Sequence, residues 1–202
     1  MTRAYRLGKR TEGVAATRRR IVETAREVVL TRGVADTSIV EISKRSGVTR
    51  PTVYQHFHTR EEIILTVFET ELRKLELQAI TRALKKEDPF QALIALLHAQ
   101  FKVWAGHTSL FQQMRGFAVT EGQRPDLDIE MEAVRERQIT DLVERLGQAG
   151  KLRNGVSQTE AADMVLLLTS FETFEQMQRQ GVPAIVMTLT NLVESAVLNK
   201  TE

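Results

Sequence analysis

The chain has 202 residues, 42% of them apolar, which is enough for one large or two small domains with a buried core. It contains no cysteine, which excludes disulfides, thiolate metal sites and a cysteine nucleophile. The net charge of +2 hides an asymmetry, because residues 1–60 hold 13 lysines and arginines against 5 acidic residues, whereas residues 61–202 hold 15 against 21. A basic N-terminal third predicts contact with a polyanion such as nucleic acid.

No part of the sequence resembles a membrane segment. The first ten residues are basic but lack an apolar core, so they do not resemble a secretory signal. Apolar runs such as residues 164–168 are far shorter than the roughly 20 residues that a membrane-spanning helix needs. We therefore expect a soluble, cytoplasmic protein that does not contact a membrane.

The N-terminal region predicts a basic arm followed by a helix. Residues 1–16 show no clear apolar periodicity, and we expect them to be a mobile arm. From Thr17 onward apolar residues recur with helical spacing, and Gly33 ends the pattern, as a glycine commonly does at a helix C-terminus. The apolar stripe of this helix consists of Ile21, Ala25, Val28 and Val29.

Residues 37–57 predict two short helices joined by a tight turn. Ile39 and Ile42 lie three residues apart on one face of the first helix, which we place at residues 38–45. Gly47 supplies the turn, because glycine adopts a positive φ without a steric penalty. Such a pair is typical of the helix-turn-helix, whose second helix enters the major groove of DNA.

The second helix of the pair, residues 49–56, has a buried face and an exposed face. Thr49 can cap its N-terminus, and Pro51 falls in the first turn, where a missing N–H costs little. Val53 and Phe57 share the inner face at spacing i, i+4. The more exposed residues suit phosphates and base edges: Arg50, Thr52, Tyr54, Gln55 and His56. A DNA interface explains the basic charge of this region better than simple solvation of helix faces does.

The remainder predicts helices only, and we count nine helices in all with no convincing strand. The later helices are expected at about residues 60–84, 88–104, 109–119, 126–149, 157–180 and 183–199. These boundaries are set by helix N-caps, such as Asp88 and the Ser157–Glu160 capping box, and by residues that end a helix, such as Gly181. We expect an all-α protein with three parts: an arm at residues 1–16, a DNA-binding domain at 17–60, and a further helical domain at 61–202.

One run of residues resembles the N-terminal motif of the tetracycline-repressor (TetR) family of bacterial regulators. It begins at Thr37 and runs Thr-Ser-Ile-x-x-Ile-Ser-x-x-Ser-Gly-Val-Thr-x-Pro-Thr-Val-Tyr-x-His-Phe-x-x-Arg-Glu-Glu-Ile. The likeness covers residues 17–66 by motif and the rest of the chain by length and helix count. Many members have glycine where Pro51 stands and lysine where Arg60 stands, and the second difference keeps the charge but changes the geometry of the contact.

The resemblance implies a homodimeric transcriptional regulator, usually a repressor, in which the N-terminal helices bind double-stranded operator DNA. It also implies that residues 61–202 are a ligand-binding and dimerisation domain. The helices of this domain would bind the partner subunit and a small-molecule effector of unknown identity, which releases the DNA. No cofactor is expected. The sequence contains no Walker loop, dinucleotide fingerprint, nucleophile elbow or zinc motif, so we do not expect an enzyme.

By match to the family pattern, Arg50 and Gln55 are the candidates for base contacts, because arginine can bond guanine and glutamine adenine through two hydrogen bonds. Thr49 and Thr52 are expected to donate to phosphates.

The predicted DNA-backbone contacts flank these residues. Tyr54 and His56 are expected to reach the backbone, and Lys44 and Arg60 to anchor phosphates on either side. Ser38 is expected both to cap the first motif helix and to meet a phosphate near its N–H groups.

Several of these residues have a second explanation. The Tyr54 ring can cover the domain core while only its hydroxyl meets DNA. His56 and His58 can form a metal pair, although no other ligand lies nearby in sequence, so no metal site is expected. The arm residues can enter a minor groove or form a disordered basic tail: Arg3, Arg6, Lys9 and Arg10. Arg18, Arg19 and Arg20 can face phosphates or simply be solvated.

The resemblance places an effector cavity among the middle helices, and an aromatic-rich lining suggests an apolar or aromatic effector. The candidate lining residues are Phe68, Leu72, His98, Phe101, Trp104, Met114 and Phe117. Apolar residues at this spacing also fit an ordinary core.

The last two predicted helices carry apolar stripes that suggest a dimer interface. Paired with their symmetry mates, these stripes would form a four-helix bundle. The candidate residues are Val165, Leu168, Phe171, Ile185, Leu189, Leu192 and Ala196. The alternative is that the stripes pack only within their own subunit.

Two functions remain open at this point. The first is a ligand-responsive repressor that binds a palindromic operator as a dimer. The second is a DNA-binding protein without an effector, acting in chromosome organisation or through a protein partner, which predicts a filled C-terminal core.

Overall fold

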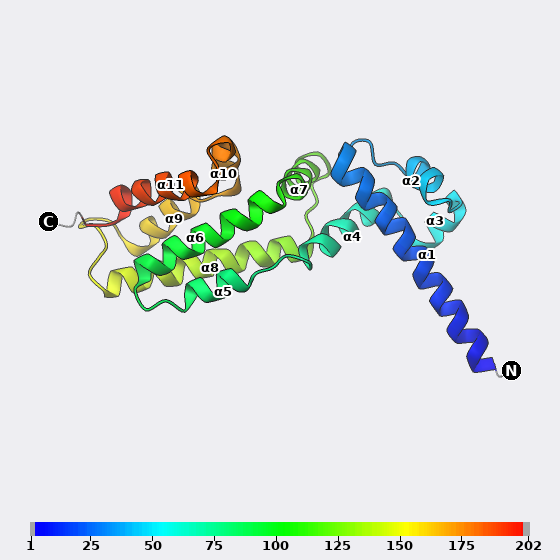
Figure 1. The fold of residues 1–202 in the computed structure, drawn as a ribbon, viewed down its shortest axis with the longest axis horizontal. Coiled ribbons are helices and arrows are strands. Elements are labelled where there is room, and N and C mark those ends of the chain that lie inside the picture. The colour runs from blue at the N-terminus through cyan, green and yellow to red at the C-terminus, as the bar shows by residue number, and fades with distance from the viewer. Residues whose placement is uncertain (1–2, 200–202) are drawn as a thin grey trace. The chain divides into compact units, whose positions relative to one another are not determined.

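The computed structural model describes residues 3–199, with side chains from residue 12 onward. This range is helical, as expected, apart from loops and one isolated bridge between Leu152 and Leu198 (Figure 1). Its elements are α1 (Arg3–Arg32), α2 (Ile39–Ser46), α3 (Arg50–His56), α4 (Arg60–Leu72), α5 (Gln78–Leu84), α6 (Pro89–Gly106), α7 (Thr108–Glu121), α8 (Asp126–Gln148), α9 (Gln158–Leu168), α10 (Phe171–Met177), the 3-10 helix η1 (Gln178–Gln180) and α11 (Val182–Val197). No described helix is long and apolar enough to cross a membrane.

The chain divides into two compact units. The first unit comprises the residues up to Lys74 together with Ser109–Asp128, and therefore contains α1 to α4 and nearly all of α7. The second unit comprises Leu75–Thr108 and the residues from Ile129 onward, and therefore contains α5, α6, most of α8, and α9 to α11.

In the first unit, α1 packs against α2 and α4, and α2 packs against α3 (Figure 1). The predicted stripe of α1 is confirmed, because its four residues have no exposed surface: Ile21, Ala25, Val28 and Val29. Phe68 of α4 meets Phe117 of α7 edge to face, with ring centroids 5.7 Å apart. Burial of such side chains contributes about 1.5–3 kcal/mol each, so α7 adds to the core that supports the helix-turn-helix.

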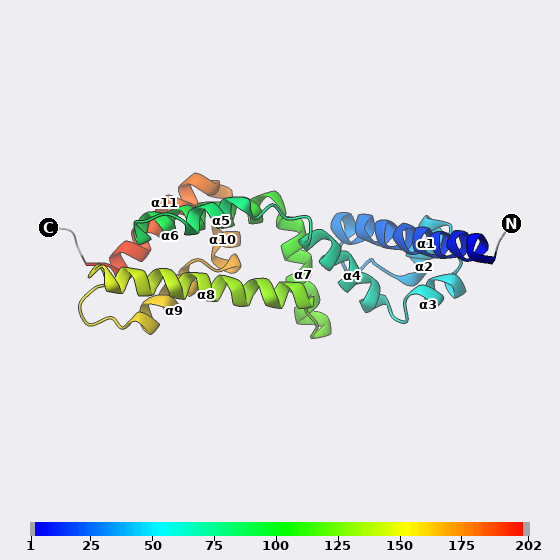
Figure 2. The same cartoon turned by 90° about the horizontal axis from the view of Figure 1, so that it is seen from below.

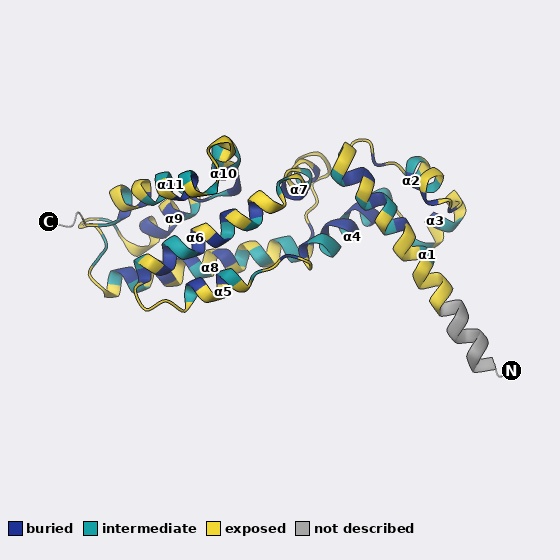
Figure 3. Cartoon of the chain, viewed as in Figure 1, coloured by how far each residue is buried: buried dark blue, intermediate teal, exposed yellow. Residues whose placement is uncertain are grey.

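Helix α1 begins at Arg3, so the prediction that the helix starts near Thr17 was wrong. An apolar stripe is needed only where a helix packs on a core, and residues 12–16 are exposed. Arginine, alanine and lysine favour helix even without packing, so the sequence carried no stripe to mark this segment. The side chains of Arg3, Arg6, Lys9 and Arg10 lie outside the described residues (Figure 3), and their minor-groove contact stays a prediction.

In the second unit, α6 lies beside α5 and α11, and α11 also lies beside α9 (Figures 1 and 2). Four aromatic side chains form its central cluster, with ring centroids 5.4 to 6.0 Å apart in each contacting pair: Phe101, Trp104, Phe171 and Phe174. Edge-to-face and offset ring contacts of this kind add to the free energy of simple burial. The cluster joins α6 to α10.

A buried arginine lies beside this cluster. Arg135 of α8 is 8% exposed, and its guanidinium carbon is 5.8 Å from the centroid of the Trp104 ring. Its Nη2 donates to the backbone oxygen of Thr169 at 2.7 Å and to the Thr169 hydroxyl at 2.9 Å, and Nη1 pairs with Glu132 at 3.2 Å. Burial lowers the pKa of Arg135, yet arginine stays charged in proteins. The guanidinium therefore holds the end of α9 against α8.

Two breaks explain why the described range contains eleven α-helices rather than the nine predicted. The helix predicted at residues 157–180 breaks after Leu168, where the Ser170 side chain accepts from the N–H of Thr173 and caps α10. Arg135 takes up the Thr169 carbonyl that this break leaves without a helical partner. The Ser170 cap was a local signal that the apolar spacing masked.

The second break divides the helix predicted at residues 60–84. Helix α4 ends at Leu72 and α5 begins at Gln78, although Leu75 between them is still buried. No glycine or proline marks this site, and Leu75 continues the helical spacing of the stripe. The break falls where the first unit gives way to the second, which periodicity does not detect.

Candidate DNA-binding site

The first helix of the predicted pair is fixed by local caps. Ser38 has an extended backbone, and its hydroxyl accepts from the N–H of Glu41 at 3.1 Å, which caps α2. Gly47 follows α2 with a φ of +66°, the left-handed conformation that glycine adopts most easily. The Ser43 hydroxyl donates to the carbonyl of Val48 at 2.6 Å, and Val48 is buried. The turn is thus fixed by a hydrogen bond from Ser43 of α2 and by the buried side chain of Val48.

The second helix presents its polar side chains outward. Thr49 caps α3 by accepting from the N–H of Thr52, and its hydroxyl lies 2.9 Å from that of Thr52. Val53 and Phe57 have no exposed surface, so the inner face is as predicted. Because they fix the rotation of α3, most of its other residues face outward (Figure 3).

The structure describes the exposure of each predicted contact residue. The exposed ones are Ser38, Lys44, Thr49, Arg50, Tyr54 and Gln55, and the half-buried ones are Thr52, His56 and Arg60. Tyr54 exposes 52% of its surface, so the ring is only partly used for packing. Among the described residues, the side chains of Lys44, Arg50 and Gln55 have no hydrogen-bond or ion-pair partner. These three long polar side chains are available to a ligand.

The basic side chains of α1 add to this surface. Arg18, Arg19 and Arg20 are exposed, and the Arg18 guanidinium carbon lies 4.4 Å from the centroid of the Phe57 ring. That cation–π contact holds Arg18 next to Phe57, the residue that follows α3. The positive potential of the region therefore comes from α1 as well as from the helix-turn-helix.

Arg60 has partners that the sequence did not predict. Its Nε donates to the carbonyl of Thr37 at 2.5 Å, and Nη2 donates to the carbonyl of Val34 at 2.6 Å. Nη1 pairs with Glu61 at 3.1 Å and with Glu121 at 3.3 Å. The Glu61 backbone N–H, together with Arg60, holds the pKa of the Glu61 carboxyl below its ordinary value despite partial desolvation. The phosphate contact predicted for Arg60 stays untested, and the guanidinium is already engaged within the first unit.

The candidate effector residues do not all belong to one unit. Phe68, Leu72, Met114 and Phe117 are core residues of the first unit. Phe101 and Trp104 belong to the aromatic cluster of the second unit. His98 is exposed and lines an open groove of about 350 Å³ between α6 and α11, together with Ile94, Ala95 and Val186.

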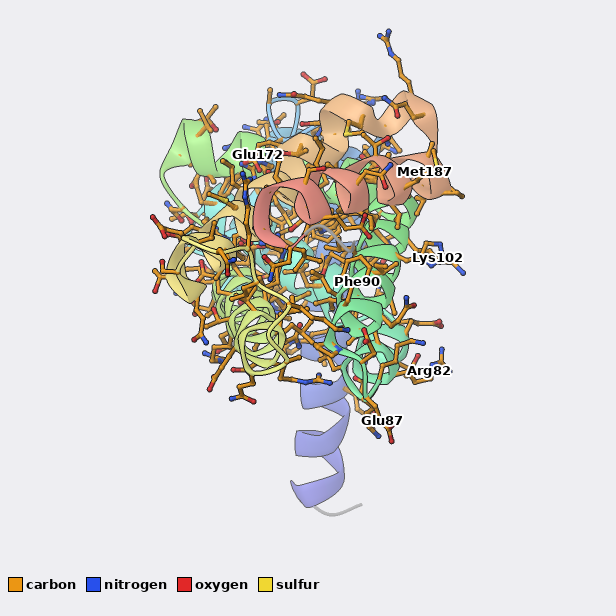
Figure 4. The ribbon with its side chains drawn as sticks, turned by 90° about the vertical axis from the view of Figure 1, so that its left-hand side faces the viewer. Arg82, Glu87, Phe90, Lys102, Glu172 and Met187 are labelled. Atoms are coloured by element: carbon orange, nitrogen blue, oxygen red, sulfur yellow. The ribbon has the colours of Figure 1, made fainter. Side chains whose placement is uncertain are left out.

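The candidate dimer residues are mostly buried within their own chain. Val165, Phe171, Ile185 and Leu189 are buried, Leu168 and Ala196 are half-buried, and Leu192 is 46% exposed. The apolar residues that α9 and α11 expose are different ones: Met164, Leu167 and Met187, in addition to Leu192. Leu167 and Met187 are 73% and 63% exposed, and Figure 4 shows Met187 at the edge of the second unit. The dimer contact of the predicted residues stays a prediction, because the structure describes a single chain.

Two capped helices joined by a left-handed glycine, with the second helix presenting arginine, tyrosine and glutamine, define a helix-turn-helix DNA-binding protein. Residues 21–67 match the family model described as "Bacterial regulatory proteins, tetR family". These residues therefore resemble the DNA-binding domain of that family.

Known proteins extend this comparison. The chain is 35% identical over 81 residues to the HTH-type transcriptional regulator SrpR of Pseudomonas putida, a match that covers 40% of this chain and 38% of SrpR. A putative transcriptional regulator from Saccharomonospora viridis, solved in complex with choline, is 18% identical with a TM-score of 0.67, covering 92% of this chain and all of that one. SmeT, the repressor of the Stenotrophomonas maltophilia multidrug efflux pump SmeDEF, is 21% identical with a TM-score of 0.59, covering 91% of each chain. The two structures share the fold along almost the whole chain.

Proposed function

We propose that this protein is a transcriptional repressor that binds a palindromic operator as a homodimer and is released by a small apolar or aromatic effector. The observation that carries the proposal is the geometry of α3. Val53 and Phe57 fix the helix in the core, while Arg50, Tyr54 and Gln55 are exposed on it. In a helix-turn-helix this is the helix that lies in the major groove.

The proposed contacts follow from the side-chain chemistry. Arg50 and Gln55 suit guanine and adenine edges, since each can form two hydrogen bonds with its base. Lys44, at the C-terminal end of α2, suits a phosphate as a point charge. Backbone contacts are assigned to the remaining predicted residues: Ser38, Thr49, Thr52, Tyr54 and His56.

Dimer formation through the second unit is supported by the apolar residues that α9 and α11 expose. Single exposed apolar residues are ordinary, but Met164, Leu167, Met187 and Leu192 occur on two helices that pack together. A twofold contact between two such helix pairs forms a four-helix interface. Such a dimer presents two copies of α3, which matches a palindromic site with half-sites about one helical turn, or a multiple of it, apart.

Release by an effector is supported by the relatives. The Saccharomonospora viridis regulator was solved with choline, and SmeT is named as the repressor of a multidrug efflux pump. We place the proposed effector site in the second unit, in keeping with the predicted ligand-binding and dimerisation domain.

One observation favours a second candidate function, an effector-independent DNA-binding protein that acts in chromosome organisation or through a protein partner. The rings of Phe101, Trp104, Phe171 and Phe174 contact one another, and Arg135 beside them is engaged by Thr169 and Glu132. A core filled in this way is what that candidate predicts.

The test is selection of bound duplexes from a random DNA pool, followed by footprinting of the selected sequence upstream of the protein's own gene. The repressor proposal expects a palindromic consensus and one protected promoter site, and a screen for compounds that release this DNA then separates the two candidates. Binding without sequence preference, at sites scattered far from promoters, would refute it in favour of the second candidate. Sedimentation of a Leu167→Glu variant tests the dimer, which should dissociate at a concentration where the wild type is dimeric.

A further inference from the structure

The turn between α1 and α2, residues Gly33 to Thr37, is held on two sides by side chains far away in sequence. The carbonyls of Val34 and Thr37 accept from Arg60 of α4 at 2.6 and 2.5 Å. The N–H of Val34 donates to the side-chain oxygen of Gln113 in α7 at 2.9 Å. Thr37 is fully buried, and its hydroxyl donates to the carbonyl of Gly33 at 3.0 Å. Three backbone polar groups of the turn therefore bond to side chains of α4 and α7.

Helix α7 contributes one face to this arrangement, with contacts at every fourth residue. Ser109 donates to the carbonyl of Leu30 at 3.0 Å, Gln113 accepts from Val34, and Glu121 pairs with Arg60 at 3.3 Å. Phe117, between the last two, is fully buried against Phe68. Residues four apart lie on one side of a helix, so α7 is joined along its length to the end of α1, the turn and α4.

Gly33 lies where the Gln113 side chain of α7 meets the turn. Its φ of +93° favours glycine, and a Cβ there would lie 3.2 Å from the side-chain oxygen of Gln113. The turn is thus shaped to receive Gln113 closely.

We propose that this turn is the joint through which α7 sets the position of α2 and α3, and that Arg60 is a positioning residue of the joint rather than a phosphate ligand. The inference rests on the proposed function, because it concerns how the DNA-binding helices are aimed. Ser38, which caps α2, directly follows the turn, so a shift of the turn moves the start of α2. Arginine is needed at position 60 because its planar fork bonds two carbonyls and two carboxylates at once, which a lysine ammonium does not do.

Two variants remove different sides of the joint. Arg60→Lys keeps the positive charge but removes the planar guanidinium. Gln113→Met keeps the size of the side chain but removes the oxygen that accepts from the Val34 N–H. Thr120→Val is the matched control, because among the described residues the Thr120 hydroxyl bonds only to carbonyls of its own helix. Circular dichroism and thermal unfolding establish that all three variants are folded at the assay temperature.

The decisive measurement is the ratio of affinities for the operator selected from the random pool and for a scrambled duplex of the same length. Arg60→Lys and Gln113→Met should each lower this ratio about tenfold, whereas Thr120→Val should leave it within about twofold. A role in stability alone would lower both affinities equally and leave the ratio unchanged, which would overturn the proposal. A phosphate role would leave Arg60→Lys close to the wild type, which would also overturn it.

A second measurement uses the protein without DNA. In hydrogen-exchange mass spectrometry, peptides that cover residues 33–46 should exchange about tenfold faster in both joint variants than in Thr120→Val. If the exchange rates of these peptides are unchanged in both variants, the proposed role of the turn is overturned, whether or not the wild type selects a DNA sequence. A wild type that selects no DNA sequence would refute the proposed function instead. Failure of the proposed joint and failure of the proposed function are therefore distinguishable.

Discussion

Replacing Arg135 with methionine should lower the free energy of unfolding of the second unit by about 2–4 kcal/mol. The guanidinium donates two hydrogen bonds to Thr169, which has no exposed surface, and a hydrogen bond to a charged group contributes about 1.5–3 kcal/mol. Methionine offsets part of this loss because it fills the same space without the desolvation cost of a buried charge. The Thr169 carbonyl would remain buried at the end of α9 without this donor.

Urea unfolding at fixed protein concentration measures this effect, with the fluorescence of Trp104 as the signal. Trp104 is the only tryptophan of the chain and belongs to the aromatic cluster beside Arg135, so it reports on the second unit. Arg137→Met on the same helix is the control, because Arg137 is exposed. If the two variants differed by less than about 0.5 kcal/mol, the buried arginine would not hold α9 to α8, and the reasoning would be refuted.

Three further predictions concern the first unit. Replacing Arg50 or Gln55 with alanine should relax the sequence preference at one position per half-site, at a cost of about 1–3 kcal/mol per lost base contact in competition binding; an unchanged consensus would show that the recognition face is misassigned. Lys44→Ala should weaken binding to every duplex and reduce the slope of log affinity against log salt by about one per site, which a salt titration measures and an unaltered slope contradicts. Burial alone would raise the pKa of Glu71, but the ion pairs with Arg26 at 2.9 Å and with Lys74 at 2.6 Å hold this pKa below its ordinary value. The ionised Glu71 carboxylate therefore stabilises the fold at neutral pH, and this stabilisation is lost as the pH falls through the depressed pKa. On acidification the free energy of unfolding of the wild type should fall by more than that of Glu71→Gln. Parallel curves of unfolding free energy against pH for the two proteins would contradict this prediction.

The sequence by itself determined the helix-turn-helix, because the interactions that form it are local. The caps at Ser38 and Thr49, the left-handed glycine at Gly47 and the i, i+4 pair of Val53 and Phe57 each involve residues within four positions of one another. Propensity, capping and apolar spacing act over that range, so the pattern in the chain indicated the structure directly.

The length of α1 and the two helix breaks were decided by exposure and packing. Residues 12–16 are exposed and need no apolar stripe, so the apolar spacing did not predict the start of α1. The end of α9 depends on Arg135, which lies 34 residues before Thr169. Neither feature has a signal in the local apolar spacing.

Only the tertiary structure decided which partners Arg60 has and that α7 belongs to the first unit. Arg60 contacts Val34, Thr37 and Glu121, which lie 26, 23 and 61 positions away, and Gln113 contacts Val34 from 79 positions away. From sequence alone, an arginine in the DNA-binding region is equally suited to a phosphate or to backbone carbonyls, because both are oxygen acceptors. Which acceptor it meets depends on how the helices fold back on one another, and that arrangement is set by burial across the whole unit rather than by spacing along the chain.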